Sequence, residues 1–99
     1  MQVNLTGGTT DSGTISFSLA GPGMFIGTMS GFRAGASSFS YVVLDGNICA
    51  IDRAVVGAGT NGYSSATCAS YLAAGNHTAR VYTDGSGLGA PWRLQVLRF

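Results

Sequence analysis

Side chains able to do acid–base or nucleophilic chemistry are few in this chain. It holds one histidine, four acidic and five basic residues, and neither Lys nor Glu occurs. A nucleophile–histidine–acid arrangement would have to pair His77 with an aspartate, and no Gly-x-Ser-x-Gly turn is present to expose a nucleophilic serine. The available aspartates are Asp11, Asp45, Asp52 and Asp84. None lies in a segment that resembles a cleft, as paired carboxylates for glycoside hydrolysis would require. We therefore predict a protein that is not an enzyme and has no catalytic residues.

Metal and cofactor sites are equally unsupported. One histidine and two cysteines cannot fill a tetrahedral zinc site without an aspartate, and their spacing matches no zinc finger. Residues 84–87 (Asp-Gly-Ser-Gly) faintly resemble a calcium loop but lack its other carboxylates. The glycines at 85, 87 and 89 precede a predicted strand, whereas a phosphate cradle needs a helix N-terminus there. The sequence predicts no metal and no cofactor.

Charge and hydropathy also exclude two classes of partner. A net charge of +1 cannot neutralise a run of phosphates, so we expect no binding to nucleic acid. No stretch approaches the ~20 apolar residues of a membrane span, so we expect no membrane insertion.

The two cysteines, Cys49 and Cys68, are candidates for a disulfide. The alternative is a pair of reduced, buried cysteines that act as small hydrophobic residues. Residues 1–6 lack the basic and apolar regions of a signal peptide. A disulfide would therefore require an oxidising medium reached by another route, such as phage lysis, or a leader that has been removed.

A set of aromatic residues beside predicted loops could bind a ligand. Sugar recognition uses an amphipathic ring that stacks on a pyranose face, with polar side chains that bind the hydroxyl groups. The candidate ligand-binding residues are Trp92, Tyr82, Tyr63, Asn61, Asp84 and Arg93. The alternative is that Trp92 and Tyr82 belong to the core.

The elements that would position these residues are strands, because apolar and polar residues alternate with a period of two. We predict strands over residues 15–19, 24–29, 38–44, 48–51, 63–68 and 92–99, and a further strand that ends near residue 82. Asp45-Gly46-Asn47 is a hairpin turn signal. Residues 57–62 and 84–91 are predicted loops, and one helical turn is allowed near residues 69–73. The fold class is therefore all-β: residues 1–99 form a single antiparallel β-sandwich, or a jelly-roll-like barrel, of about seven or eight short strands.

One short motif resembles a known corner. Residues 72–81 follow the pattern Leu-x-x-Gly-x-His-x-Ala-x-Val. This run resembles the corner that enters a late strand in fibronectin-like and immunoglobulin-like sandwiches. The resemblance implies sandwich architecture. We expect the His77 ring to pack at the sandwich edge with an N–H on a backbone carbonyl.

The charge-poor surface favours a protein that works in an assembly, because Arg is enriched and Lys depleted at protein interfaces. In size and composition the chain resembles the compact β-modules of phage tail fibres, spikes and head decorations. That resemblance implies a structural or adhesion module located in a virion or in the extracellular space. Its expected partners are copies of itself (as a trimer) or other virion proteins. It would also contact a cell-surface glycan. The alternative is a small carbohydrate-binding module, and a secreted hydrolase or inhibitor is a second alternative.

Overall fold

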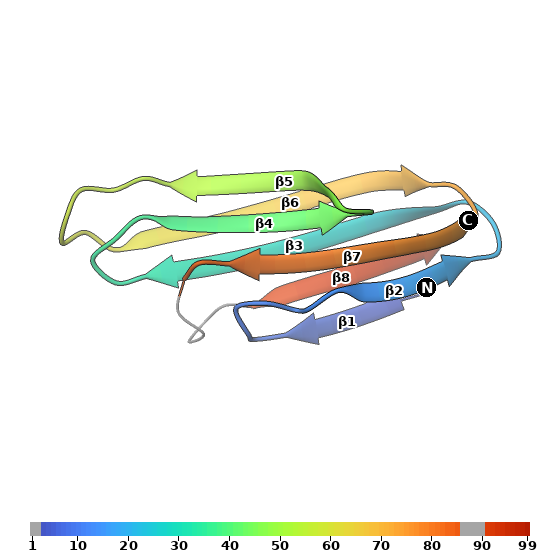
Figure 1. Cartoon of the computed structure of the whole chain (residues 1–99), viewed down its shortest axis with the longest axis horizontal. Coiled ribbons are helices and arrows are strands. Elements are labelled where there is room, and N and C mark those ends of the chain that lie inside the picture. The colour runs from blue at the N-terminus through green and yellow to red at the C-terminus, as the bar shows by residue number, and fades with distance from the viewer. Residues whose placement is uncertain (1–2, 86–90) are drawn as a thin grey trace.

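A computed structural model describes residues 3–85 and 91–99, which form a sandwich of two antiparallel four-stranded sheets (Figure 1). Sheet I has the order β1 (Val3–Gly7), β8 (Trp92–Arg98), β3 (Gly23–Arg33) and β6 (Gly62–Leu72). Sheet II has the order β2 (Ile15–Leu19), β7 (Gly75–Thr83), β4 (Ser38–Leu44) and β5 (Asn47–Ala54). The prediction of an all-β sandwich is confirmed. Within the described ranges there is no helix long and apolar enough to cross a membrane.

The core lies between the two sheets, and the period of two in the sequence decides which side chains enter it. Along β3, Phe25 and Met29 are fully buried, whereas Ile26 and Thr28 between them are partly exposed and face outward. Glycines on the same inner face allow the sheets to approach closely. A Cβ atom at Gly27 would lie 2.8 Å from Val42 Cγ1, and one at Gly31 would overlap Thr83 Oγ1. The high glycine content of this chain therefore includes positions that packing requires.

Three segments differ from the sequence prediction. Strand β1 was not predicted, because its short alternation becomes a strand only through pairing with β8 along the register Val3↔Val96 to Gly7↔Trp92. Strand β3 extends to Arg33 because β6 pairs with its whole length. The helical turn near residues 69–73 is wrong, since residues 69–72 continue β6 opposite β3. Of the predicted loop over residues 84–91, residues 86–90 lie outside the described part of the chain.

The disulfide between Cys49 and Cys68 is confirmed, with 5.8 Å between the two Cα atoms. It joins β5, the edge strand of sheet II, to β6, the edge strand of sheet I (Figure 1). Val42 pairs with Ala50 and Val43 with Ile48, so Cys49 is left between two paired positions. This irregularity is typical of a β-bulge, which redirects a side chain. The bulged residue is thus the one that reaches across to the other sheet.

Candidate functional site

A groove opens at the end of sheet I where β3 ends and β6 begins. Its volume is about 580 Å³. It is lined by Ser30, Gly31, Phe32, Asp52, Tyr63, Ser64, Ser65 and Pro91. Phe32 and Tyr63 are cross-strand partners, and their ring centroids are 4.9 Å apart with the planes tilted by 40°. The Tyr63 side chain is 69% exposed, so the groove presents aromatic surface to solvent.

The acidic residue of the groove comes from the other sheet. Asp52 lies on β5, and its Oδ2 accepts a hydrogen bond from the backbone N–H of Ser65 at 2.7 Å. That N–H belongs to the free edge of β6, so the carboxylate satisfies an edge donor that would otherwise need water. In residues 3–85 and 91–99, Asp52 Oδ1 has no hydrogen-bond partner. The groove therefore holds one carboxylate oxygen free to accept a hydrogen bond from a ligand.

A buried cluster of hydroxyl groups supports the groove from below. Ser64 Oγ lies 2.8 Å from Ser38 Oγ and 2.6 Å from Ser40 Oγ, and these bonds join β6 to β4. Thr83 Oγ1 extends the cluster by donating to the carbonyl oxygen of Phe39 at 2.7 Å. Because buried hydroxyl groups need partners, this cluster holds the two sheets in one relative position. The neighbours of Ser64 on the same strand, Tyr63 and Ser65, are thereby held facing outward.

Three of the predicted ligand-binding residues lie at this end of the sandwich. Tyr63 is in the groove. Asn61 Oδ1 accepts the backbone N–H of Gly35 at 3.0 Å. Asp84 accepts the backbone N–H of Phe39 at 2.7 Å and forms an ion pair with Arg33 at 3.3 Å. Asn61 and Asp84 thus position the backbone beside the groove.

The other three predicted residues lie on separate surfaces. Tyr82 is on the outer face of sheet II, where Tyr41 stacks on it at 4.6 Å and the Arg80 guanidinium lies 4.4 Å from its ring centroid. Trp92 packs against the core, and its Nε1–H donates to Thr9 Oγ1 at 3.2 Å. Arg93 donates to Asn4 Oδ1 at 3.3 Å on the outer face of sheet I. The six candidates therefore do not form one site.

Sequence reasoning missed Phe32 and Asp52 as groove residues. The signal for Phe32 was weak, because it precedes a turn and only its pairing with Tyr63 shows its role. Asp52 enters the groove through the contact between β5 and β6, which joins two different sheets. No local pattern in the sequence encodes that contact.

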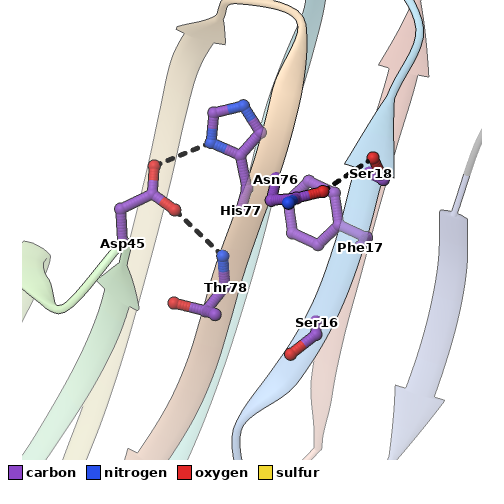
Figure 2. A pocket seen from close by; sticks show the side chains of 7 residues that line it. All are labelled: Ser16, Phe17, Ser18, Asp45, Asn76, His77 and Thr78. Atoms are coloured by element: carbon purple, nitrogen blue, oxygen red, sulfur yellow. Dashed lines mark hydrogen bonds and ion pairs between the residues drawn. The ribbon is translucent and has the colours of Figure 1, made fainter.

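A second pocket, of about 570 Å³, surrounds His77 at the other end of sheet II (Figure 2). His77 Nδ1 lies 2.8 Å from Asp45 Oδ2, and Nε2 lies 2.8 Å from the carbonyl oxygen of Ala73. Asp45 Oδ1 also accepts the backbone N–H of Thr78 at 2.9 Å. Phe17 stacks on the imidazole with 5.7 Å between centroids. The expected edge position of His77, with an N–H on a backbone carbonyl, is confirmed.

The electrostatics of this corner favour a charged histidine. Both neighbours of the ring are acceptors, so both bonds form only when both ring nitrogens carry a proton. The hydrogen bond to Asp45, followed by that to Ala73, raises the pKa of His77 above its ordinary value. Burial acts to raise the pKa of Asp45, but the hydrogen bonds from His77 and Thr78 outweigh it and the net pKa is lowered. Neither ring nitrogen is left to accept a proton from a nucleophile, which argues against a catalytic role.

Comparisons with known proteins give a likeness of fold. No family model matches the chain, and no curated protein matches it in sequence.

Among the described residues, no three His, Cys, Asp or Glu side chains are grouped so that they could hold a metal ion.

Solved structures that resemble this chain include three sugar-related proteins. The chain is similar over 97% of its length to 76% of the EclA C-terminal domain, a sugar-binding protein, with 10% identity and a TM-score of 0.44. It is similar over 87% of its length to 70% of the carbohydrate-binding module CBM36 in complex with calcium and xylotriose, with 12% identity and a TM-score of 0.40. Over 85% of its length it resembles a cycloisomaltooligosaccharide glucanotransferase of Paenibacillus sp., with 15% identity and a TM-score of 0.41, but it spans 12% of that chain. At these TM-scores the likeness carries no argument about function.

Proposed function

We propose that this chain is a non-catalytic carbohydrate-binding module that holds a neutral sugar in the groove of Phe32 and Tyr63. The observation that carries the proposal is an exposed tyrosine ring beside a carboxylate oxygen that has no partner among the described residues. A pyranose has an apolar face that stacks on an aromatic ring and a rim of hydroxyl groups that need acceptors and donors. Tyr63 supplies the ring, and Asp52 with the hydroxyl groups of Ser30 and Ser65 supplies the polar partners.

The charge of the groove favours a neutral sugar over an acidic one. Among the described residues that line the groove, Asp52 is the one that carries a charge, and none is an Arg. An anionic sugar would place its carboxylate near that of Asp52 without a cation to offset the repulsion.

The same single carboxylate argues for binding without hydrolysis. Glycosidases place two carboxyl groups about 5–9.5 Å apart across the scissile bond. In the described part of the chain, the groove lining holds one carboxyl group, that of Asp52. A hydrolase or inhibitor therefore gains no support from this site.

The test has two steps. A glycan array identifies the short neutral oligosaccharides that bind, and titration calorimetry then measures their affinity. We expect Tyr63→Ala to weaken the binding of a trisaccharide about tenfold, which corresponds to about 1.4 kcal/mol. Tyr71→Ala is the matched control, because Tyr71 is on the same face of β6, is 74% exposed and lies beyond the reach of a trisaccharide in the groove. A wild-type protein that binds no glycan, or equal losses in the two variants, would show that the groove is not a sugar site.

The setting of the module stays a prediction. A virion or extracellular location, and a role in adhesion as a phage-like appendage, are compatible with a sugar-binding tip. No observation on the described residues favours a phage origin over another one.

A further inference from the structure

The aromatic residues on the outer faces of the two sheets differ in whether other side chains cover their rings. On sheet II the rings are covered: Arg80 lies over Tyr82, Tyr41 stacks on the same ring, and Arg53 lies 6.0 Å from the centroid of Phe39. On sheet I no cation lies over an aromatic ring in the described residues. Tyr71 and Phe99 are 74% and 68% exposed, and form a second aromatic pair with centroids 5.9 Å apart. Sheet I therefore presents uncovered aromatic surface at both ends of β6.

The residues between the two aromatic pairs form a continuous uncharged strip. We define the strip as the outward-facing cross-strand partners on β3 and β6. From one end to the other these are Phe32 and Tyr63, Ser30 and Ser65, Thr28 and Thr67, Ile26 and Ala69, and Met24 and Tyr71. None of the ten is charged, and the middle of the strip is made of small and hydroxyl-bearing side chains. Two charged residues flank the strip: Asp52, which bonds to the Ser65 N–H at the groove, and Arg93 on β8, which is paired with Thr28 and bonded to Asn4.

The dimensions of the strip fit a long and narrow ligand. At the antiparallel rise of about 3.4 Å per residue, the interval from Tyr63 to Tyr71 spans about 27 Å, and two strands are about 4.8 Å apart. The molecule itself is 49 Å long and 19 Å wide, so the strip occupies more than half of its length. A ligand that touches both aromatic pairs must be extended along the strands.

We propose that the strip is a binding platform for a linear, uncharged polysaccharide, with its first subsite in the groove and its last at Tyr71 and Phe99. This inference rests on the function proposed above. A neutral polysaccharide matches the strip because it offers apolar sugar faces to the two aromatic pairs and hydroxyl groups to Ser30, Ser65, Thr28 and Thr67 between them. The absence of charge along the strip matches the absence of charge on the polymer.

The test measures affinity as a function of chain length. Cello-, xylo- and malto-oligosaccharides, from trisaccharide to octasaccharide, are titrated into the wild-type protein. We expect the affinity for the matching series to rise about tenfold from trisaccharide to octasaccharide. We expect Tyr71→Ala to abolish that rise and to leave trisaccharide binding unchanged, whereas Tyr63→Ala weakens the binding of both lengths.

A second variant tests the middle of the platform. Thr67→Glu places a charged side chain at an exposed position between the two aromatic pairs. It should weaken octasaccharide binding at least tenfold and leave the thermal midpoint unchanged. Circular dichroism melts of all variants check the fold.

The outcomes separate the two proposals. Trisaccharide binding without a gain for longer chains would overturn the platform and keep the groove. No binding at any length would overturn the proposed function itself. If light scattering shows a dimer that Tyr71→Ala dissociates, with octasaccharide binding unchanged, then a second copy of this chain covers the strip and the platform is wrong.

Discussion

At the residue scale, the most constrained polar group is His77, because both of its ring nitrogens face acceptors. The imidazole ring bonds to Asp45 on one side and to the carbonyl oxygen of Ala73 on the other. When the ring loses a proton, one of these bonds becomes a contact between two acceptors. The geometry of the corner between β6 and β7 therefore favours the protonated form of His77.

This arrangement predicts that stability falls as the pH rises through neutrality. The folded-state pKa of His77 is raised above the ordinary value of 6.5. Its contribution to the free energy of unfolding is thus complete below pH 6.5 and is lost as the pH rises through the folded pKa. Urea denaturation at a series of pH values from below 6.5 upward should show the free energy of unfolding decreasing as the pH rises. His77→Gln should remove it, and because the chain has one histidine, an unchanged slope in the variant would contradict this assignment.

At the element scale, the two long sides of the sandwich differ (Figure 1). The β5 and β6 edges are joined by the disulfide and by Asp52, whose carboxylate accepts the Ser65 N–H. These links also hold Asp52 beside the groove. The opposite edges, β1 and β2, carry no charged residue along their lengths.

Removal of the disulfide should therefore affect both stability and binding. The two cysteines are separated by 19 positions in the chain. In the chain-entropy picture a loop of this size contributes about 3 kcal/mol to the free energy of unfolding. We expect the double variant Cys49→Ser/Cys68→Ser to lose about that amount in guanidinium denaturation.

Removal of the disulfide should also change the affinity of the groove for a ligand, which is measured separately from stability. At a temperature where the double variant is still folded, it should bind the trisaccharide more weakly than the wild type, because Asp52 is less firmly held beside Ser65. The wild-type protein without reductant is the control. Equal affinities would mean that the hydroxyl cluster of Ser38, Ser40 and Ser64 holds the groove without the disulfide.

At the scale of the whole molecule, one side of the sandwich is a candidate interface for the predicted homo-oligomer. Strands β1 and β2 are the edges of sheets I and II opposite the β6 and β5 edges, and Leu5 on β1 is 41% exposed although its partner Leu94 is buried. Free strand edges without charges or prolines are prone to pair with another chain. Assembly through this side would leave the strip on β3 and β6 open.

Light scattering after size exclusion gives the measurement. We expect a mass that is a multiple of the 10.1 kDa protomer, with three copies favoured. Leu5→Asp at the β1 edge should shift the protein toward the monomer. A monomeric wild-type protein at micromolar concentration would contradict the predicted assembly.

The sequence alone determined the features that depend on local pattern. Alternation along residues 15–19 and 38–44 predicted strands β2 and β4, and Asp45-Gly46-Asn47 predicted the turn between β4 and β5, where Asp45 and Gly46 adopt positive φ.

Only the tertiary structure decided which surface is available to a ligand. Tyr63, Tyr82 and Trp92 look alike in sequence, as aromatic residues beside loops. Packing separates them: Trp92 fills the space above Gly7, Tyr82 is covered by Arg80, and Tyr63 stays exposed beside Asp52. The physical reason is that exposure and hydrogen-bond partners are set by neighbours on other strands, and strands from two different sheets meet only when the sandwich closes.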